Sequence, residues 1–433
     1  MIAAPNSGSG KTTITLGILR ALRNRGVSIG PAKAGPDFID PAFHTAASGQ
    51  VCVNLDPWAM RPNLLHKLAD SQVEKGSLLV EAMMGLFDGA ADGTGSAADL
   101  AVMLELPVVL VVACARQSHS VAALVSGFRS FRASVVIAGV ILNRVGSQRH
   151  EVMMREAMDA ISVPVLGCVY RSDELELPSR HLGLVQADEH ADLESFLECA
   201  AETMEQSVEI EKLLNLGGIS TAFAEPVFPI PPLGQQICIA QDKAFRFLYP
   251  HLLKGWKDQG AEVSFFSPLE NEMPTKDCDA IFLPGGYPEL HAETLSQNEE
   301  FFAGLKRAAD RGAIIYGECG GYMVLGEGLI DANCTRHKMA NLLPLCTSFE
   351  KRKLQLGYRV ATCLTKTPIG TSGSRLSAHE FHYSTIVDTA DLDGTSVQPL
   401  FDVSDARGTQ LGSVGIHSGN VMGSYMHIID RRN

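Results

Sequence analysis

Residues 313–325 read AIIYGECGGYMVL, which places a cysteine, Cys319, between two apolar runs. The pattern is typical of a buried strand that turns sharply into a helix. Gly317 and Gly321, two residues before and after the cysteine, favour such a turn because a Cβ there would collide with a neighbouring strand or helix. We therefore predict a nucleophile elbow at Cys319. We also expect the positive end of the following helix to favour the thiolate.

Two further segments fit acyl chemistry at this cysteine. Residues 279–289, DAIFLPGGYPE, predict a strand that runs into a glycine turn, whose backbone N–H groups can hold a developing oxyanion. A histidine is expected as the base, and the candidates are His379, His382, His417 and His427. A lone cysteine or histidine is usually structural. The chain order PGGYPE, GECGGY and then a C-terminal histidine instead indicates a thiol-dependent enzyme.

A phosphate-binding loop is predicted near the start of the chain. PNSGSGKTT, residues 5–13, follows a short apolar run and precedes a helical pattern. Lys11 supplies charge to the terminal phosphates, and the Thr12 hydroxyl suits Mg²⁺. Pro5 stands where the usual motif has its first glycine, so the alternative is a glycine-rich helix cap with an incidental lysine. The predicted ATP-binding residues of the loop are Gly8, Ser9, Gly10, Lys11, Thr12 and Thr13.

Acidic residues follow predicted strands in the same half. Asp37 and Asp40 stand in GPDFIDP, Glu81 ends an apolar run, and Asp88 stands in MGLFDG. Acids at the carboxyl ends of parallel strands face the crevice where α/β proteins bind ligands, and Mg·ATP needs oxygen ligands. The alternative for Asp40 and Asp88 is a helix cap or a turn former, whereas Glu81 would otherwise be a buried charge.

The alternation of elements predicts two α/β domains with mainly parallel sheets covered by helices. In the first half we expect strands at 1–5, 77–83, 107–113, 135–142 and 163–169, and helices at 11–24, 118–131 and 148–161. In the second half we expect strands at 236–241, 262–266, 280–283 and 313–316, a helix at 301–311, and hairpin strands at 357–364, 381–387 and 412–417. The predicted domains are 1–190 and 236–433, with a charged helix over 188–214 and a Pro- and Gly-rich linker in 191–235.

The composition, with 45% hydrophobic and 20% charged residues, is that of a soluble globular protein. A net charge of −13 argues against nucleic acid as the main partner. The ten cysteines form no CxxC pair, and no apolar run reaches the roughly 18 residues that span a bilayer. We expect a cytoplasmic protein without a membrane partner, and a homodimer is compatible with the sequence.

The second half resembles a class I glutamine amidotransferase domain, which has a flavodoxin-like fold. The resemblance implies that Cys319 attacks the glutamine amide, that His427 activates the thiol, and that Gly286 and Gly320 donate to the oxyanion. Many members carry a glutamate two residues after the histidine. Ile429 stands there in this chain, and Asp430 follows it. Either the group that orients His427 comes from elsewhere, or Cys319 and His427 work as a dyad.

Nearly the whole chain resembles the cobyrinic/hydrogenobyrinic acid a,c-diamide synthases of corrin biosynthesis. The resemblance rests on the strings APNSGSGKTT, KAGPDFIDPAFH, VEAMMGLFDG, AGVILNRVGSQRH, LPSRHLGLVQA, LPGGYPELHA, GECGGYMVLG and HEFHYS. It implies ATP-dependent amidation of the a and c carboxylates through acyl phosphates, with ammonia from glutamine. The first domain would be a P-loop NTPase-like sheet similar to dethiobiotin synthetase.

The resemblance also implies roles for residues of the first domain. Thr12, Asp37 and Glu81 would serve Mg²⁺, and Asn143 would approach the adenine. Asp40 and Asp88 would line the substrate side. Relatives often carry an aspartate where Ala113 stands, and we expect Glu81 to suffice. Likeness around residues 83–101 favours cobalt-free hydrogenobyrinic acid over cobyrinic acid. The alternatives are amidation of other corrin carboxylates or of a cell-wall precursor, and a partitioning-type switch ATPase.

Overall fold

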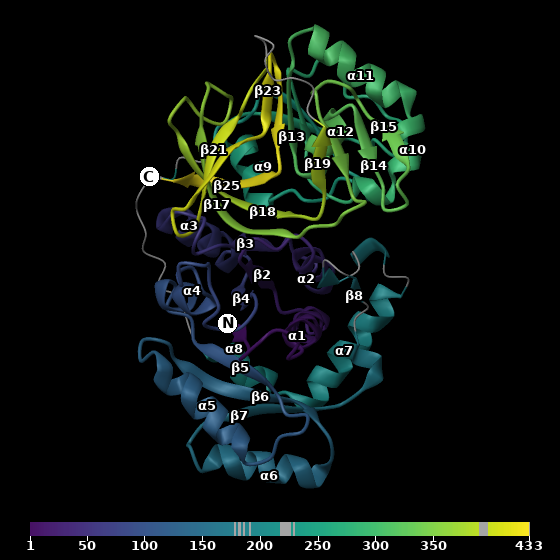
Figure 1. The fold of residues 1–433 in the computed structure, drawn as a ribbon. Coiled ribbons are helices and arrows are strands. Elements are labelled where there is room, and N and C mark those ends of the chain that lie inside the picture. The colour runs from purple at the N-terminus through teal and green to yellow at the C-terminus, as the bar shows by residue number, and fades with distance from the viewer. Residues whose placement is uncertain are drawn as a thin grey trace. The chain divides into compact units, whose positions relative to one another are not determined.

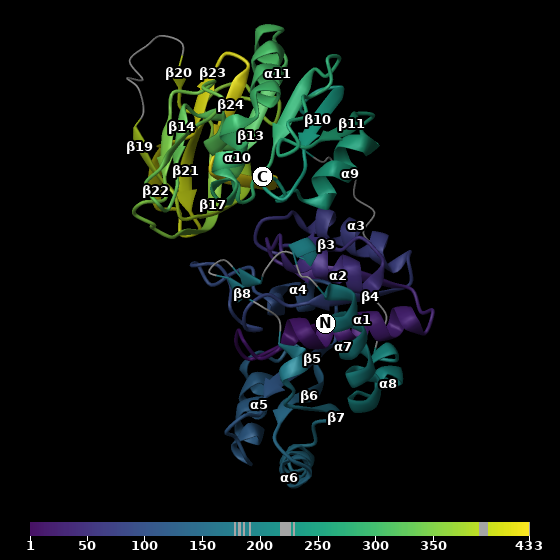
Figure 2. The same ribbon diagram turned by 90° about the vertical axis from the view of Figure 1, so that its right-hand side faces the viewer.

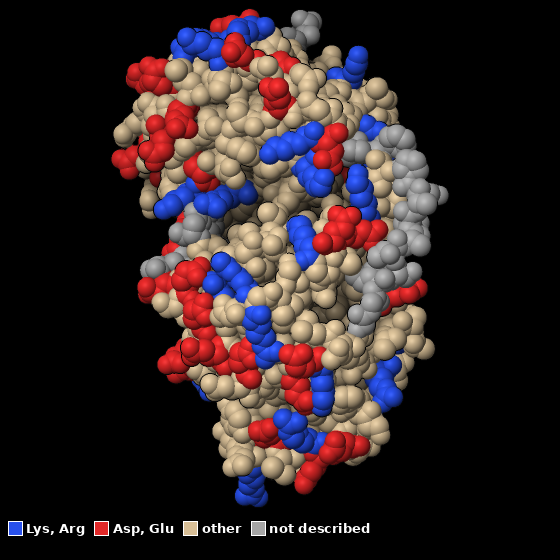
Figure 3. Space-filling model, turned by 180° about the vertical axis from the view of Figure 1, so that it is seen from behind, with Lys and Arg blue, Asp and Glu red and all other residues tan. Residues whose placement is uncertain are grey.

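The computed structural model describes residues 1–176, 179–180, 183–184, 187–189, 192–216, 227, 230–388 and 397–432. The chain divides into two compact units, Met1–Val227 and Phe228–Asn433, and each is described by itself (Figure 1). Among the described residues, no helix is long and apolar enough to cross a membrane. On the face shown in Figure 3, acidic and basic side chains are mixed over the surface of each unit.

The N-terminal unit is built on seven parallel strands in the order β3-β2-β4-β1-β5-β6-β7. They are β1 (Ile2–Ala3), β2 (Ile29–Ala34), β3 (Val53–Leu55), β4 (Ser77–Glu81), β5 (Val108–Ala113), β6 (Ile137–Val145) and β7 (Val165–Tyr170). The central strands are apolar and buried, as expected of a sheet that is covered on both faces. Their carboxyl ends share one edge of the sheet, where β1 leads into the PNSGSGKTT loop.

Helices cover this sheet on both faces, with α1 (Lys11–Asn24) and α7 (Leu193–Ser207) packed together on one face and α5 (Ser120–Phe131) on the other (Figure 2). Leu16, Phe43, Val111 and Leu197 belong to the buried core between α1, α7 and the sheet. The other helices are α2 (Asp40–Ser48), α3 (Pro62–Val73), α4 (Ala97–Met103), α5 (Ser120–Phe131), α6 (Gln148–Asp159) and α8 (Ile210–Leu214). The described short elements are η1 (Asp173–Leu175), β8 (Ser179–Arg180), β9 (Gly183–Leu184) and η2 (Ala187–Glu189).

The C-terminal unit also has a seven-stranded sheet, in the order β11-β10-β12-β13-β24-β23-β20. Its first five strands are parallel, and β23 and β20 extend it antiparallel. The strands are β10 (Gln236–Ala240), β11 (Glu262–Phe266), β12 (Ala280–Leu283), β13 (Ile314–Glu318), β20 (Val397–Gln398), β23 (Ile416–Ser418) and β24 (Val421–Ser424). The helical elements are α9 (Pro250–Asp258), η3 (Pro288–Leu290), α10 (Ala292–Gln297), α11 (Glu299–Asp310) and α12 (Gly320–Leu325).

Two antiparallel sheets complete this unit, in the orders β22-β21-β17-β18-β25 and β15-β14-β16-β19. Their strands are β14 (Gly328–Ile330), β15 (Arg336–Lys338), β16 (Cys346–Ser348), β17 (Gln355–Cys363), β18 (Arg375–His382), β19 (Thr385–Asp388), β21 (Phe401–Asp405), β22 (Gln410–Val414) and β25 (Met426–Arg432). Only Tyr425 separates β24, which pairs with β13, from β25, which pairs with β18. The chain therefore leaves the parallel sheet beside the end of β13 and carries His427 with it.

The predicted α/β class is confirmed, with a P-loop-type parallel sheet, a second α/β domain and extra C-terminal strands. The expected helix over 188–214 is confirmed in part: α7 and α8 cover most of it but are separate, because Val208 is extended and bridges to Gly167. Expected strand 381–387 covers the end of β18 and most of β19, and 412–417 is broken at Gly415, whose φ is +74°. Within the range that holds the predicted Pro- and Gly-rich linker, residues 217–226 and 228–229 lie outside the described residues.

Candidate active sites

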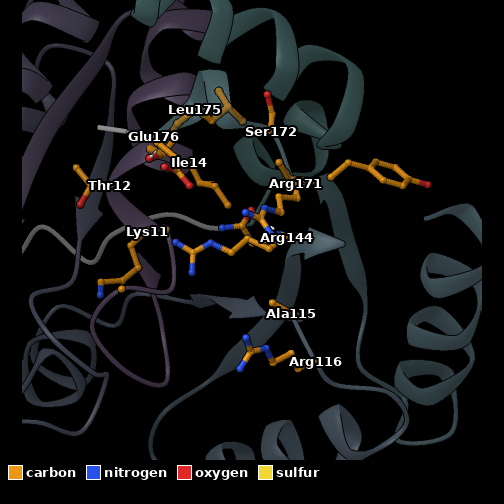
Figure 4. A pocket seen from close by; sticks show the side chains of 16 residues that line it. Lys11, Thr12, Ile14, Ala115, Arg116, Arg144, Arg171, Ser172, Leu175 and Glu176 are labelled. Atoms are coloured by element: carbon orange, nitrogen blue, oxygen red, sulfur yellow. Dashed lines mark hydrogen bonds between the residues drawn. The ribbon is translucent and has the colours of Figure 1, made fainter. Parts of the chain in front are cut away.

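A cavity of about 710 Å³ lies at the carboxyl edge of the N-terminal sheet (Figure 4). The phosphate loop supplies one wall, and the ends of β5, β6 and β7 supply the others. Three arginines come to the cavity from those strand ends: Arg116, Arg144 and Arg171. The loop residues that line it are Gly8, Gly10, Lys11, Thr12 and Thr13, together with Asn143 of β6. The size, the position and the positive charge suit a nucleoside triphosphate.

Asn143 and the phosphate loop fix each other. The Asn143 Nδ2 donates to the Ser9 carbonyl oxygen at 2.9 Å, and its Oδ1 accepts from the Arg144 N–H at 2.9 Å. A Cβ at Gly10 would lie 2.2 Å from Asn143 Nδ2, and the φ of Gly10 is +87°. Only glycine fits this position, because the backbone is left-handed and the space is taken.

The loop lysine is held by the segment that follows β4. Lys11 Nζ donates to the Met84 carbonyl oxygen at 2.7 Å. Asp88 Oδ2 accepts from the Gly85 N–H at 2.8 Å, so Asp88 caps the same turn. Burial lowers the pKa of Lys11 from its ordinary value, against the attraction of Glu81. Lys11 and Asp88 thus belong to one arrangement, with the Met84 carbonyl between them.

Glu81 is the centre of a buried charged cluster. Its Oε1 accepts from Thr12 Oγ1 at 2.8 Å and from Lys33 Nζ at 2.7 Å, and its Oε2 lies 2.6 Å from His44 Nε2. Lys33 Nζ also contacts Asp40 Oδ2 at 2.5 Å. The cluster therefore joins the phosphate loop to the residues after β2.

The charges in this cluster stabilise one another. Burial opposes the charge on Lys33, but Asp40 and Glu81 outweigh it and raise the pKa of Lys33. Burial likewise opposes the charge on Glu81, but Lys33 and His44 lower its pKa below the ordinary value. Asp37 differs: burial and then the Asp40 charge raise its pKa to about 6, although its Oδ1 accepts from the Ile39 and Asp40 N–H groups.

The residues predicted to bind Mg²⁺ offer oxygen atoms as metal ligands, and the Thr12 hydroxyl lies 2.8 Å from Glu81 Oε1. Within the described part of the chain, no group of three or more His, Cys, Asp or Glu side chains is arranged to hold a metal ion. A magnesium ion here would need phosphate and water ligands as well. The donor set thus fits Mg²⁺ bound with a nucleotide, which keeps few protein ligands.

Sequence reasoning missed several residues of this site. Lys33 and His44 stand inside the KAGPDFIDPAFH string, and the signal was a lysine and a histidine flanking two acids. The cavity arginines carried no local signal, because each follows a different strand and only the sheet brings them together.

In the C-terminal unit, Cys319 stands on a strained turn between β13 and α12, with φ 47° and ψ −105°. A Cβ at Gly321 would lie 1.9 Å from the Leu283 carbonyl oxygen, and one at Gly317 would lie 2.9 Å from the Gly321 carbonyl oxygen. The predicted collisions are confirmed. Such strain persists only where the surroundings enforce it, as at a nucleophile elbow.

The expected stabilisation of the thiolate is wrong for the protein without substrate. Burial raises the pKa of Cys319, and the nearby Glu289 acts in the same direction, whereas the hydrogen bond from the Gly320 N–H opposes them. Helix α12 (Gly320–Leu325) has only 6 residues, so its dipole does not compensate for the loss of water. The thiol is neutral and needs a base.

Three of the four candidate histidines gather near Cys319. His427 on β25 pairs in register with His379 on β18, and Cys319 Sγ contacts the Phe381 carbonyl oxygen at 3.8 Å. A Cβ on Gly285 would lie 2.4 Å from His427 Cε1 and 3.2 Å from Cys319 Cβ, so the imidazole and the cysteine meet at this glycine. The fourth, His417, lies on β23, and its Nδ1 is 2.9 Å from Thr365 Oγ1.

The predicted oxyanion donors lie together beside the elbow. The Gly286 backbone nitrogen is 3.1 Å from the point where a Cβ of Gly320 would stand. A Cβ on Gly286 itself would lie 2.0 Å from the Ala244 carbonyl oxygen, so this turn requires glycine. The backbone of Gly286 thus lies close to that of Gly320 beside the elbow.

A carboxyl group faces His427 from the strand that carries the elbow. Glu318 Oε2 lies 3.8 Å from His427 Nδ1, and both side chains are buried. Glu318 Oε1 accepts from Tyr316 Oη at 3.1 Å and from the Ile428 N–H at 3.2 Å. Ile429, the position where many class I amidotransferases have a glutamate, is a buried core residue.

Comparison with known proteins relates both units to described families. Residues 1–185 match the CobQ/CobB/MinD/ParA nucleotide binding domain, and residues 236–433 match the CobB/CobQ-like glutamine amidotransferase domain. The chain is 57% identical to the hydrogenobyrinate a,c-diamide synthase of Brucella anthropi, over 99% of this chain and 98% of that protein. It is 56% identical to the protein of that name from Rhizobium meliloti, over 99% and 98%. The protein of that name from Mesorhizobium japonicum is 47% identical, over 100% and 98%.

Proposed function

The chain belongs to the hydrogenobyrinate a,c-diamide synthase family, and on that premise we propose that it amidates the a and c side-chain carboxylates of hydrogenobyrinic acid. ATP activates each carboxylate, and glutamine supplies the ammonia. The observation that carries the proposal is that one chain holds both a phosphate loop with a nucleotide-sized cavity and a strained, buried cysteine beside a histidine.

In the N-terminal unit, the substrate carboxylate attacks the γ-phosphorus of ATP, which forms an acyl phosphate and releases ADP. Lys11 and the N–H groups of the phosphate loop hold the phosphates, and Asn143 faces the adenine. Thr12, Glu81 and Asp37 would hold Mg²⁺, which when bound neutralises charge on the phosphates. The buried cluster supports this assignment, because Lys33 and His44 keep Glu81 ionised.

Asp40 and Asp88 are assigned to the substrate side of this site. Both already engage protein groups, Lys33 Nζ and the Gly85 N–H. We therefore assign Asp40 the positioning of Lys33 next to the substrate carboxylate. Asp88 is assigned the positioning of the turn that contacts Lys11. Ammonia then attacks the acyl phosphate, which yields the amide and inorganic phosphate.

In the C-terminal unit, Cys319 Sγ attacks the side-chain amide of glutamine, and His427 takes the thiol proton. The N–H groups of Gly286 and Gly320 stabilise the oxyanion. The amide nitrogen leaves as ammonia with the proton from His427, and water hydrolyses the thioester to release glutamate. A neutral buried thiol suits this order of events, because the nucleophile forms only when a base accepts its proton.

The test is to incubate the purified protein with Mg·ATP, glutamine and either hydrogenobyrinic or cobyrinic acid, and to count the added amides by mass spectrometry. We expect two amides on hydrogenobyrinic acid, none from glutamine with Cys319→Ser, and two again when that variant receives ammonium salt. ATP hydrolysis without amidation of either corrin would support a switch ATPase instead. Amidation of cobyrinic acid alone, or of more than two carboxylates, would reassign the substrate.

A further inference from the structure

The carboxyl group of Glu318 is held by two elements at once. It belongs to the last residue of β13, and its Oε1 accepts from Tyr316 of the same strand and from the Ile428 N–H of β25. Ile428 directly follows His427. The hydrogen bond from the Ile428 N–H thus links β25 to the end of β13. The other carboxyl oxygen, Oε2, lies 3.8 Å from His427 Nδ1.

Other carboxyl groups near His427 have different partners. Glu380 of β18 pairs with Arg359 Nε at 2.8 Å and with His382 Nε2 at 3.0 Å. Asp430 of β25 lies near His251, whose Nε2 contacts the Ile429 carbonyl oxygen at 2.8 Å; burial lowers the pKa of His251, and this contact and the Asp430 charge only partly oppose that. Among the described residues, Glu318 is a carboxyl group that contacts the His427 ring, through Oε2 and Nδ1.

We propose that Glu318 is the positioning residue of the glutaminase centre: it holds His427 through Nδ1 and so directs Nε2 to the thiol of Cys319. The inference rests on the proposed role of Cys319 in glutamine hydrolysis. A distance of 3.8 Å is longer than a hydrogen bond, and catalytic hydrogen bonds in free enzymes often shorten when substrate binds. The nucleophile Cys319 and Glu318, the acid that orients His427, are thus adjacent in sequence.

The pKa values of His427 and Glu318 explain what the contact between them contributes to the reaction. Burial lowers the pKa of His427 to about 3, and the charges of His379 and His382 act in the same direction. Burial raises the pKa of Glu318 to about 8. When the thiol proton moves to His427, a buried imidazolium forms. Its charge favours the ionised form of Glu318, and the carboxylate beside Nδ1 in turn stabilises the imidazolium.

The test is steady-state glutamine hydrolysis by the full-length chain, measured as glutamate release, alongside ammonia-dependent corrin amidation. Glu318→Gln keeps the size of the side chain and an oxygen acceptor for Ile428, but it removes the ionisable carboxyl group. We expect kcat for glutamine to fall about 10²–10⁴-fold with a change in KM of less than about threefold. The ammonia-dependent rate should be unchanged. Glu318→Asp should recover at least about tenfold in kcat.

Two comparisons show whether the role is one of positioning. Glu262→Gln, at an exposed glutamate of β11 in the same unit, should keep the wild-type kcat. Tyr316→Phe removes one hydrogen bond to the Glu318 carboxyl group but keeps the group, and should cost less than about tenfold. The pH profile of kcat/KM should also shift in Glu318→Gln, which a purely structural defect would not produce.

A kcat of Glu318→Gln within about threefold of wild type would overturn the inference, as would a parallel loss of the ammonia-dependent rate. Retention of glutaminase activity by Cys319→Ser would instead overturn the proposed function. Loss in Cys319→Ser together with wild-type rates in Glu318→Gln would overturn only the role of Glu318.

Discussion

Lys33 and Glu81 are a buried ion pair whose members depend on each other and on Asp40 and His44. Removal of one charge would leave another without compensation in the protein interior, which typically costs about 3–5 kcal/mol. The pair also has a functional side, because the Glu81 oxygen bonded to Lys33 is the one that accepts from Thr12 of the phosphate loop. The Glu81 carboxylate therefore contributes both to the stability of the fold and to the nucleotide-binding site.

Lys33→Met tests this dependence. In the wild type the folded-state pKa of Glu81 is depressed, so its contribution to stability is present above its ordinary value of 4.5 and is lost as the pH falls through the folded-state pKa. In the variant, burial raises the pKa of Glu81, so folding takes up a proton. We expect the free energy of unfolding of the variant to be about 3 kcal/mol lower than that of the wild type at pH 7.5. This difference should be smaller at pH 5. Calorimetric unfolding at both pH values measures it. An equal gap at both pH values would contradict the account.

The Gly285→Ala variant tests the position of the His427 ring beside Cys319. The added Cβ of Gly285→Ala would overlap His427 Cε1 at 2.4 Å, so the ring has to move. We expect glutamine hydrolysis to fall at least about 10²-fold, while ammonia-dependent amidation remains, because misplacing a catalytic group by about 1 Å has this effect. Assays of both activities on one preparation decide it. Wild-type glutaminase activity would mean that the ring is not held against this glycine.

At the scale of elements, the packing of α1 on α7 positions the phosphate loop, since α1 begins at Lys11. The helices approach closely at Gly17, where a Cβ would lie 2.6 Å from the Ala200 carbonyl oxygen and 2.6 Å from Met204 Cγ. A backbone oxygen cannot turn aside as a side chain can. Gly127 in α5 is also a helical glycine, but no atom lies within 4 Å of its added Cβ.

These two glycines make a matched pair. Gly17→Ala should destabilise the N-terminal unit by about 1–3 kcal/mol, which lowers its melting temperature by about 2–10 °C. Gly127→Ala should leave it unchanged or raise it, because alanine favours helix by about 1 kcal/mol over glycine. The transition that responds to ATP in a calorimetric scan reports on this unit. Equal effects of the two substitutions would show that α1 and α7 have room to separate.

At the scale of the whole molecule, two compact units carry separate chemistry. The N-terminal unit holds the phosphate loop and the cavity, and the C-terminal unit holds the elbow. Among the described residues, the hydrogen bonds and ion pairs given above for each site join residues of the same unit. A defect in one site should therefore leave the basic chemistry of the other intact.

Lys11→Ala is the test of this separation. The variant should lose ATP-dependent amidation and the thermal stabilisation by Mg·ATP, which amounts to about 2.7 kcal/mol when the ligand is at 100 times its Kd. It should retain glutamine hydrolysis, since Lys11 belongs to the other unit. Amide formation, melting temperature and glutamate release on the same sample give the three readouts. Loss of glutaminase activity as well would reveal coupling between the units.

The sequence by itself determined the features that depend on short-range geometry. The elbow at Cys319 and the phosphate loop at Lys11 are each set by glycines within a few residues, because left-handed backbone and close approach leave no room for a Cβ. The alternation of elements likewise determined the α/β class. Element ends, and breaks such as Val208 and Gly415, depended on tertiary pairing and could not be read from local patterns.

Only the tertiary structure decided which distant groups meet. Glu318 accepts from the N–H of a residue 110 positions later, and Lys33 reaches Glu81 across 48 positions. Those contacts depend on strand order and register, which no local pattern fixes. The ionisation of Cys319 was decided in the same way: the short helix favours a thiolate, but burial outweighs it, and burial is a property of the folded chain.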